Sequence, residues 1–154
     1  MKLAEALILR ADLQKRLEQI KNRLYKNVLT QEGESPTEDP YALLKEFMTG
    51  QEELTKLIKA INRTNNDTPF DGDMMLSDAL VERDALLAKR SILVGAAEQA
   101  SEKRERYSLT EIKSISTIDV VNFQKQADQL AKNFRELDTK IQAMNWTVDL
   151  FELF

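Results

Sequence analysis

The most regular feature of this sequence is an apolar stripe in its last third. The stripe consists of Val120, Phe123, Ala127, Leu130, Phe134, Leu137, Ile141 and Met144. Spacings of three and four residues place all of these side chains on one side of an α-helix, where other helices must cover them. The pattern therefore predicts an all-α fold, an antiparallel bundle of long helices with coiled-coil-like faces.

The scarcity of helix-breaking residues supports long helices elsewhere in the chain. The 154 residues include only 4 Gly and 3 Pro, which is unusual for a turn-rich β architecture. We expect a single helical domain of residues 1–154, with helices at residues 2–28, 40–62, 75–101 and 119–145.

Local signals predict where the second helix starts and where it is interrupted. Asp39 followed by Pro40 is a typical helix start, because an N-cap side chain precedes a proline at the first helical position. Gly50 lies inside a pattern in which Thr49 and Glu52 form a capping box. This pattern predicts a break in the second helix near residue 49.

Two other segments are predicted to be irregular or extended. Ile112, Ile115 and Ile118 recur every third residue between Ser and Thr, which fits either a tight helical turn or a short extended piece near residues 108–118. The apolar tail, residues 146–154, begins at Trp146 and holds five more large apolar side chains after it. So much apolar surface must dock on protein, and this tail is a second candidate for extended structure.

The composition excludes several classes of chemistry. The chain has no Cys and no His, which excludes structural zinc, thiol nucleophiles and histidine relays. A metal would need oxygen ligands. The loop from Asp67 to Asp78 resembles an EF-hand only partly, since Pro69 stands at its third position and Asp78 at its twelfth, so we expect a structural turn there.

Charge and hydropathy indicate a cytoplasmic protein that binds neither nucleic acid nor the membrane interior. The net charge is −4, which does not favour nucleic-acid binding. The longest apolar run, residues 92–97, is far shorter than the roughly 20 residues of a membrane-spanning helix. Glu5, Arg10 and Asp12 interrupt what would be the core of a signal peptide. Residues 1–30 are rich in bases and residues 31–78 in acids, which favours docking of one segment on the other, within a chain or between subunits.

Three arginines interrupt the apolar stripes of the predicted helices and form the first candidate site. Arg10, Arg83 and Arg90 each occupy a position where an apolar residue is expected. A guanidinium at a buried position needs carboxylates or a bound anion. We expect ion pairs within or between subunits, with an anion pocket or an oxygen-ligand metal site as alternatives. Acidic residues that could serve are Glu5, Asp12, Glu82, Asp84, Glu136 and Asp138.

A second candidate site consists of amides near the end of the second predicted helix. Asn62 and Asn65 are expected to end that helix by hydrogen bonding to its free carbonyls. The alternative is a ligand site in which Trp146 stacks beside these amides. No catalytic residue and no cofactor are predicted.

Several segments together resemble a family of small bacterial proteins labelled septicolysin. The resemblance covers nearly the whole chain, including MKLAEAL, INRTN, LSDALVERDALL, YSLTEIK and QKQADQLAKNFRELDTKIQ. The label implies a pore-forming cytolysin, and the family is otherwise described as of unknown function. The resemblance implies no active-site residues at any position of this sequence.

The resulting hypothesis is a non-enzymatic structural or interaction protein of that family. It is expected to assemble as a homo-oligomer, either a dimer or a higher assembly such as a hexamer. The first alternative is a membrane-active cytolysin, as the label suggests. The second is a protein that binds a small anion or a metal through Arg, Asp and Glu on its helices.

Overall fold

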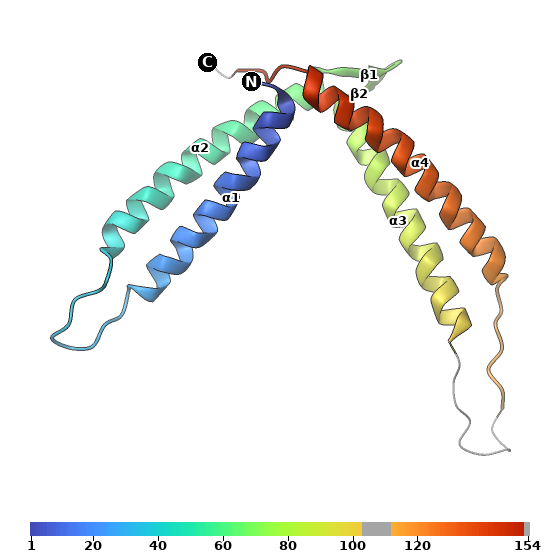
Figure 1. Cartoon of the computed structure of the whole chain (residues 1–154), viewed down its shortest axis with the longest axis horizontal. Coiled ribbons are helices and arrows are strands. Elements are labelled where there is room, and N and C mark those ends of the chain that lie inside the picture. Colours follow the sequence, from blue (N-terminus) through green and yellow to red (C-terminus); the bar gives the residue numbers. More distant parts are fainter. Residues whose placement is uncertain (103–111, 153–154) are drawn as a thin grey trace. The chain divides into compact units, whose positions relative to one another are not determined.

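The computed structural model describes residues 1–102 and 112–152, and it confirms the all-α fold with long antiparallel helices (Figure 1). Its elements are α1 Leu3–Lys26, α2 Pro40–Asp67, β1 Pro69–Asp71, β2 Met74–Met75, α3 Leu76–Ser101 and α4 Val120–Thr147. The contacts divide the chain into two compact units, residues 1–77 with 142–154, and residues 78–141. The boundaries between these units fall inside α3 and α4. The expectation of a single domain stays a prediction, and each unit is described by itself.

The first unit is built on the antiparallel pair of α1 and α2, which lie side by side in Figure 1. Its core contains Leu17 and Ile20 from α1 and Leu43 and Leu54 from α2. The basic first segment and the acidic second segment therefore dock on each other within one chain. Each buried Leu or Ile side chain contributes roughly 1.5–3 kcal/mol through removal of apolar surface from water.

The start of α2 is the one that the sequence predicts. The Tyr41 backbone N–H donates to Asp39 Oδ1 over 3.0 Å, and Pro40 occupies the first helical position. The side chain of Asp39 thus satisfies one of the N–H groups that a helix start leaves without a partner.

The predicted break near residue 49 is wrong, because α2 runs without interruption from Pro40 to Asp67. Gly50 serves packing between helices instead. A Cβ added at Gly50 would lie 2.8 Å from Leu17 Cδ2. The missing side chain lets Leu17, which is 5% exposed, enter the surface of α2. The glycine marks a close approach of two helices.

Replacing Gly50 with Ala tests this interpretation. In a helix interior, alanine is more favourable than glycine by about 1 kcal/mol. At position 50, however, the alanine methyl group overlaps Leu17, and such overpacking costs roughly 1–3 kcal/mol. We expect Gly50→Ala to lower the free energy of unfolding by about 1 kcal/mol in urea denaturation. In a Leu17→Val background, which lacks the overlapping Cδ atom, the same change should stabilise the chain. Additive effects of the two substitutions would contradict the close contact.

The end of α2 also differs from the prediction. Asn62 and Asn65 lie inside the helix, which continues to Asp67. Thr64, which is fully buried, donates from Oγ1 to the Ala60 carbonyl over 2.8 Å. The two-stranded antiparallel sheet of β1 and β2 follows, with Gly72 in its turn at φ 55°. The positive φ suits glycine, which has no Cβ to clash.

The tail docks on its own chain, in the first unit. The Leu3 N–H donates to the Val148 carbonyl and the Leu150 N–H to the Met1 carbonyl, each over 2.9 Å. Lys2 and Asp149 form an antiparallel β-bridge, so the extended piece predicted at the C-terminus exists. Of the other predicted extended piece, residues 112–118 are non-helical, with Ile112 95% exposed, and residues 108–111 lie outside the described residues.

The second unit contains most of α3 and α4, which run antiparallel and side by side (Figure 1). Its buried apolar side chains, among the described residues 78–102 and 112–141, are Ala79, Ala97, Ala127 and Ile141. Three of these four are alanines, so every large apolar side chain among the described residues of this unit, other than Ile141, is at least partly exposed.

Candidate functional site

The arginine on the α3 stripe pairs with an aspartate on α4. Arg83 Nη1 lies 2.9 Å from Asp138 Oδ1, and Arg83 Nε lies 3.9 Å from Asp84 Oδ1. The side chains of Arg83 and Asp138 are 25% and 31% exposed. A half-buried pair of this kind joins the two helices and neutralises a charge that would otherwise oppose their packing.

The other two arginines have different surroundings. Arg90 is exposed on α3, two turns beyond Arg83. Arg10 is half-buried on α1 and belongs to the first unit. Asp84 is 74% exposed. An anion site that uses these residues stays a prediction.

A polar cluster exists near the end of α2, but it does not consist of the amides that the sequence indicates. Asn62 and Trp146 are exposed, and Asn65 is half-buried. The structure instead joins Arg63 and Thr64 of α2 to the tail. The Phe151 N–H donates to Thr64 Oγ1 over 2.9 Å, and the Arg63 guanidinium lies 5.4 Å from the centre of the Phe151 ring. We term Arg63, Thr64 and Phe151 the tail clamp.

Sequence reasoning missed the tail clamp because its signal is weak. Threonine in a helix interior is common when its hydroxyl bonds to the carbonyl four residues earlier. Thr64 differs from such threonines only in being buried, and its burial depends on the tail. The apolar residues after Trp146 did signal that the tail docks, but they did not identify the surface.

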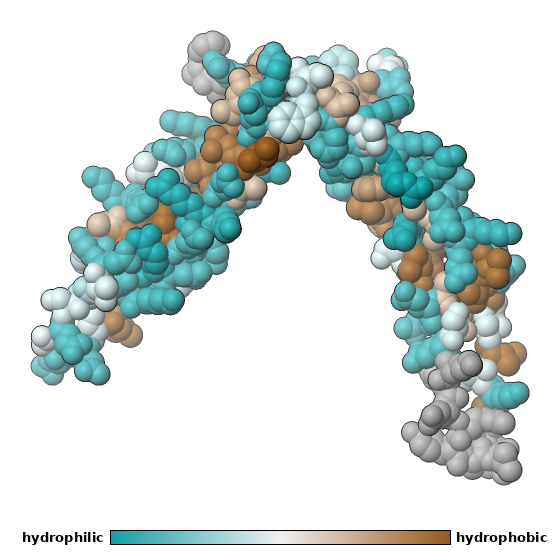
Figure 2. All heavy atoms as spheres, viewed as in Figure 1, coloured by the Kyte–Doolittle hydropathy of each residue, from teal (hydrophilic) through white to brown (hydrophobic). Residues whose placement is uncertain are grey.

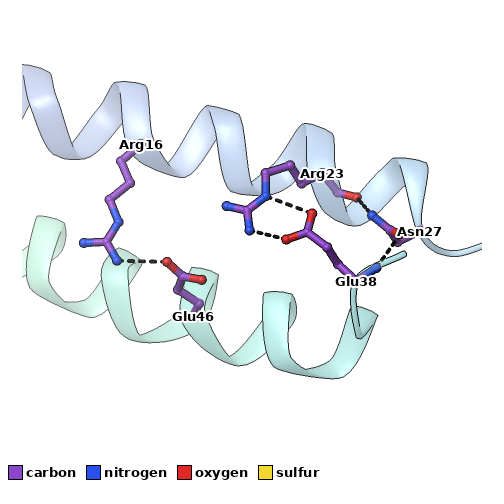
Figure 3. A network of polar contacts seen from close by, with 5 residues as sticks. All are labelled: Arg16, Arg23, Asn27, Glu38 and Glu46. Carbon is purple, nitrogen blue, oxygen red and sulfur yellow. Dashed lines mark hydrogen bonds and ion pairs between the residues drawn. The ribbon is translucent and has the colours of Figure 1, made fainter. Parts of the chain in front are cut away.

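A polar network joins α1 to the start of α2, and Figure 3 shows it. Arg16 Nη2 donates to Glu46 Oε1 over 2.9 Å, and Arg23 Nε donates to Glu38 Oε2 over 3.0 Å. Arg23 also donates through Nη2 to Glu38 Oε1, which makes a two-pronged pair. Asn27 completes the network, since its side chain donates to the Arg23 carbonyl and accepts from the Glu38 N–H.

The charges in this network shift the ionisation of its members. The hydrogen bonds from Arg23 lower the pKa of the Glu38 carboxyl below its ordinary value of 4.5. The same pairing raises the pKa of the Arg23 guanidinium. A similar contact from Lys2 lowers the pKa of Asp149 in the tail. These pairs lie at the surface, where water screens them, so they fix the register of neighbouring segments more than they add stability.

The Glu38 pair predicts a measurable pH dependence. A carboxyl whose pKa is lowered by folding stabilises the fold above its ordinary pKa, and that contribution is lost as the pH falls from 4.5 through the lowered value. We expect the Glu38 carboxyl to titrate below 4.5 by NMR. In an Arg23→Gln chain its midpoint should rise. An unchanged midpoint in that variant would show that Arg23 is not the cause.

Residues 1–102 and 112–152 contain no group of three or more carboxylates close enough to hold a metal ion. No helix among those residues is long and apolar enough to cross a membrane.

Two grooves follow the helix pairs, one in each unit. The first, about 330 Å³, lies between α1 and α2 beside Gly50, with Leu13, Leu17 and Ile20 in its lining. The second, about 480 Å³, lies between α3 and α4 and is lined by Lys89, Ile92, Leu93, Gln126, Gln129 and Leu130. Hydrophobic residues reach the surface along both helix pairs in Figure 2. Both grooves therefore present apolar side chains at the surface of their helix pair.

These features define a class of small helical proteins built from antiparallel helix pairs. Residues 10–150 match the model of a family of unknown function, DUF6847, and the chain belongs to that family. A crystal structure of a functionally unknown conserved protein from Corynebacterium diphtheriae is similar, with 40% identity, 98% of this chain and 99% of that chain covered, and a TM-score of 0.92. A comparison with curated proteins gives no match. Neither the family nor the crystal structure is described as a septicolysin.

Proposed function

We propose that this protein is a non-enzymatic, self-associating structural or interaction protein of the cytoplasm. One observation carries the proposal. In the described residues of the second unit, the buried apolar side chains are three alanines and Ile141, so the other large apolar residues of this unit lack full cover. Proteins rarely leave long apolar surfaces in water unless a partner covers them.

The exposed residues of this unit extend the argument. Val81, Leu87 and Ile92 of α3 are 68%, 45% and 72% exposed, and Val121 of α4 is 59% exposed. In a pair of helices, each helix is covered by its partner on one side only. In a four-helix bundle, each helix is covered by two neighbours, so a wider apolar face is buried. A second copy that adds two more helices gives the apolar stripes the coiled-coil-like cover that their spacing predicts.

The septicolysin resemblance suggests an alternative function for the exposed apolar surface of the second unit, namely contact with lipid. The observation that favours protein over lipid is the charge pattern. Lys89 and Arg90 are close in sequence to the acidic residues Asp84 and Glu98 on the exposed part of α3. A helix that binds anionic membranes has a predominantly basic polar face.

The native mass of the protein tests this proposal directly. We expect the full-length chain to give a discrete mass that is a multiple of 17.7 kDa by light scattering on a sizing column. We also expect no dye release from vesicles that contain anionic lipid. A mass of one chain at every concentration up to about 100 μM, well above the μM to pM dissociation constants of standard-sized interfaces, would contradict self-association. Dye release would support the cytolysin reading in its place.

A further inference from the structure

An exposed row of uncharged side chains follows one face of α2 in the first unit. The α2 row consists of Tyr41, Leu44, Met48, Gln51 and Thr55, whose spacings of three and four place them on one face of the helix. Resting on the self-association proposed above, we infer that the α2 row binds the α2 row of a second copy in antiparallel orientation. This contact belongs to the first unit, so it is additional to any contact that the apolar surface of the second unit makes.

The described part of the chain does not cover the apolar members of the α2 row. Tyr41, Leu44 and Met48 are 82%, 40% and 55% exposed. The neighbouring face of the same helix is already occupied, since Leu43 and Leu54 belong to the core that α2 forms with α1. Three large apolar side chains therefore line up in water over two turns of α2, and such an alignment is typical of a surface that contacts another protein.

The two polar members of the α2 row can be buried at little cost. Thr55 Oγ1 donates to the Gln51 carbonyl over 2.8 Å, and Gln51 Nε2 lies 3.5 Å from Thr55 Oγ1. Neither side chain carries a charge, so their burial does not require desolvation of an ion. The row has no charged member although 31% of the residues in the chain are charged, and depletion of charge at the centre of a contact surface is typical of protein interfaces.

Charges beside the row select a second copy as the occupant. Lys45 and Glu52 are exposed and two helical turns apart, so they lie on the same edge of the row. A two-fold axis perpendicular to both helices places each edge of the row beside the same edge of the other copy. When residue 48 aligns with residue 51 of the second copy, residue 45 aligns with residue 54, which is roughly 3 Å along the helix axis from Glu52. Each copy thus brings a base beside the other's acid, and the symmetry produces this match twice.

A substitution at the centre of the α2 row tests the inference in the full-length chain. Met48→Glu places a charge in the contact, and we expect the native mass by light scattering to fall below that of the parent, with dissociation at least about tenfold stronger. The matched control is Thr49→Glu, because Thr49 is exposed on the same helix but lies about 100° around its axis from Met48. This control should keep the parent mass. Circular dichroism checks that both variants stay helical.

Charge reversal tests the pairing between copies without changing an apolar position. Lys45→Glu and Glu52→Lys should each weaken the assembly, and the double variant should restore it, because opposite charges again lie beside each other. The two positions are roughly 10 Å apart along one helix, so a rescue reports a contact between copies rather than within one. An equal mixture of the two single variants should also recover the parent mass.

The outcomes separate this contact from self-association in general. A parent oligomer that survives Met48→Glu and both reversals overturns the α2 contact and leaves self-association standing. A parent chain that is monomeric throughout overturns both. If Met48→Glu unfolds, the reversals and their rescue decide the matter.

Discussion

A chain that ends at Asn145 is expected to lose about 3 kcal/mol or more of its unfolding free energy. The removed tail accepts one hydrogen bond from the Leu3 N–H and donates two, to the Met1 carbonyl and to Thr64 Oγ1. Each such bond is worth about 1 kcal/mol net, and the apolar surface of Val148 and Leu150 adds to this sum. Urea denaturation followed by circular dichroism measures the loss.

The control for this truncation is a chain that ends at Glu152. It keeps the bridge between Lys2 and Asp149 and every contact of the tail clamp. We expect its unfolding midpoint to match that of the full chain. If both shortened chains unfold at the same urea concentration, the docked tail contributes nothing and the account of the tail clamp is wrong.

The second large effect is expected in the core between α1 and α2. Ile20 is 2% exposed and packs with Leu17, Leu43 and Leu54. Ile20→Ala leaves a cavity there and should cost about 3 kcal/mol, within the usual range for such truncations. Cavity formation sets the cost, so the loss should appear in the unfolding midpoint in urea.

Another isoleucine of the same helix provides the control. Ile8 is 54% exposed on α1, and Ile8→Ala makes the same chemical change with little loss of packing. We expect it to shift the unfolding free energy by less than about 0.5 kcal/mol, as for most surface substitutions. Equal losses at both positions would mean that Ile8 is also covered, which a partner chain would explain.

The fold was predictable from the sequence because helical spacing is a local property. The spacings of three and four in residues 120–144, and the start at Asp39 and Pro40, depend on neighbours within a few turns. The predicted break at residue 49 was wrong because the role of Gly50 depends on a residue more than a few turns away in the sequence. From its neighbours in sequence, Gly50 is expected to be a flexible position. Only its contact with the distant Leu17 shows that it allows another helix to approach.

The candidate polar sites were predictable only in part. An arginine on an apolar stripe does need an acid, and Asp138, one of the acids named from the sequence, supplies it for Arg83. Arg90 shares the stripe by spacing but is exposed. The rotation of a helix about its axis depends on what packs against it, and periodicity alone does not fix that rotation when apolar residues lie on several sides. Thr64 was missed for the same reason, since its burial depends on a distant partner.

The bridge between Lys2 and Asp149 has a consequence for how this chain is made. Lys2, the residue just before α1, gains this partner late, because Asp149 is synthesised after the whole of the second unit. Closing so long a loop carries a large entropic cost, and contacts of this span slow folding. While synthesis continues, the first helix pair has its own core but not its final strand pairing. The newly made protein therefore completes its first unit only after its second unit has been synthesised.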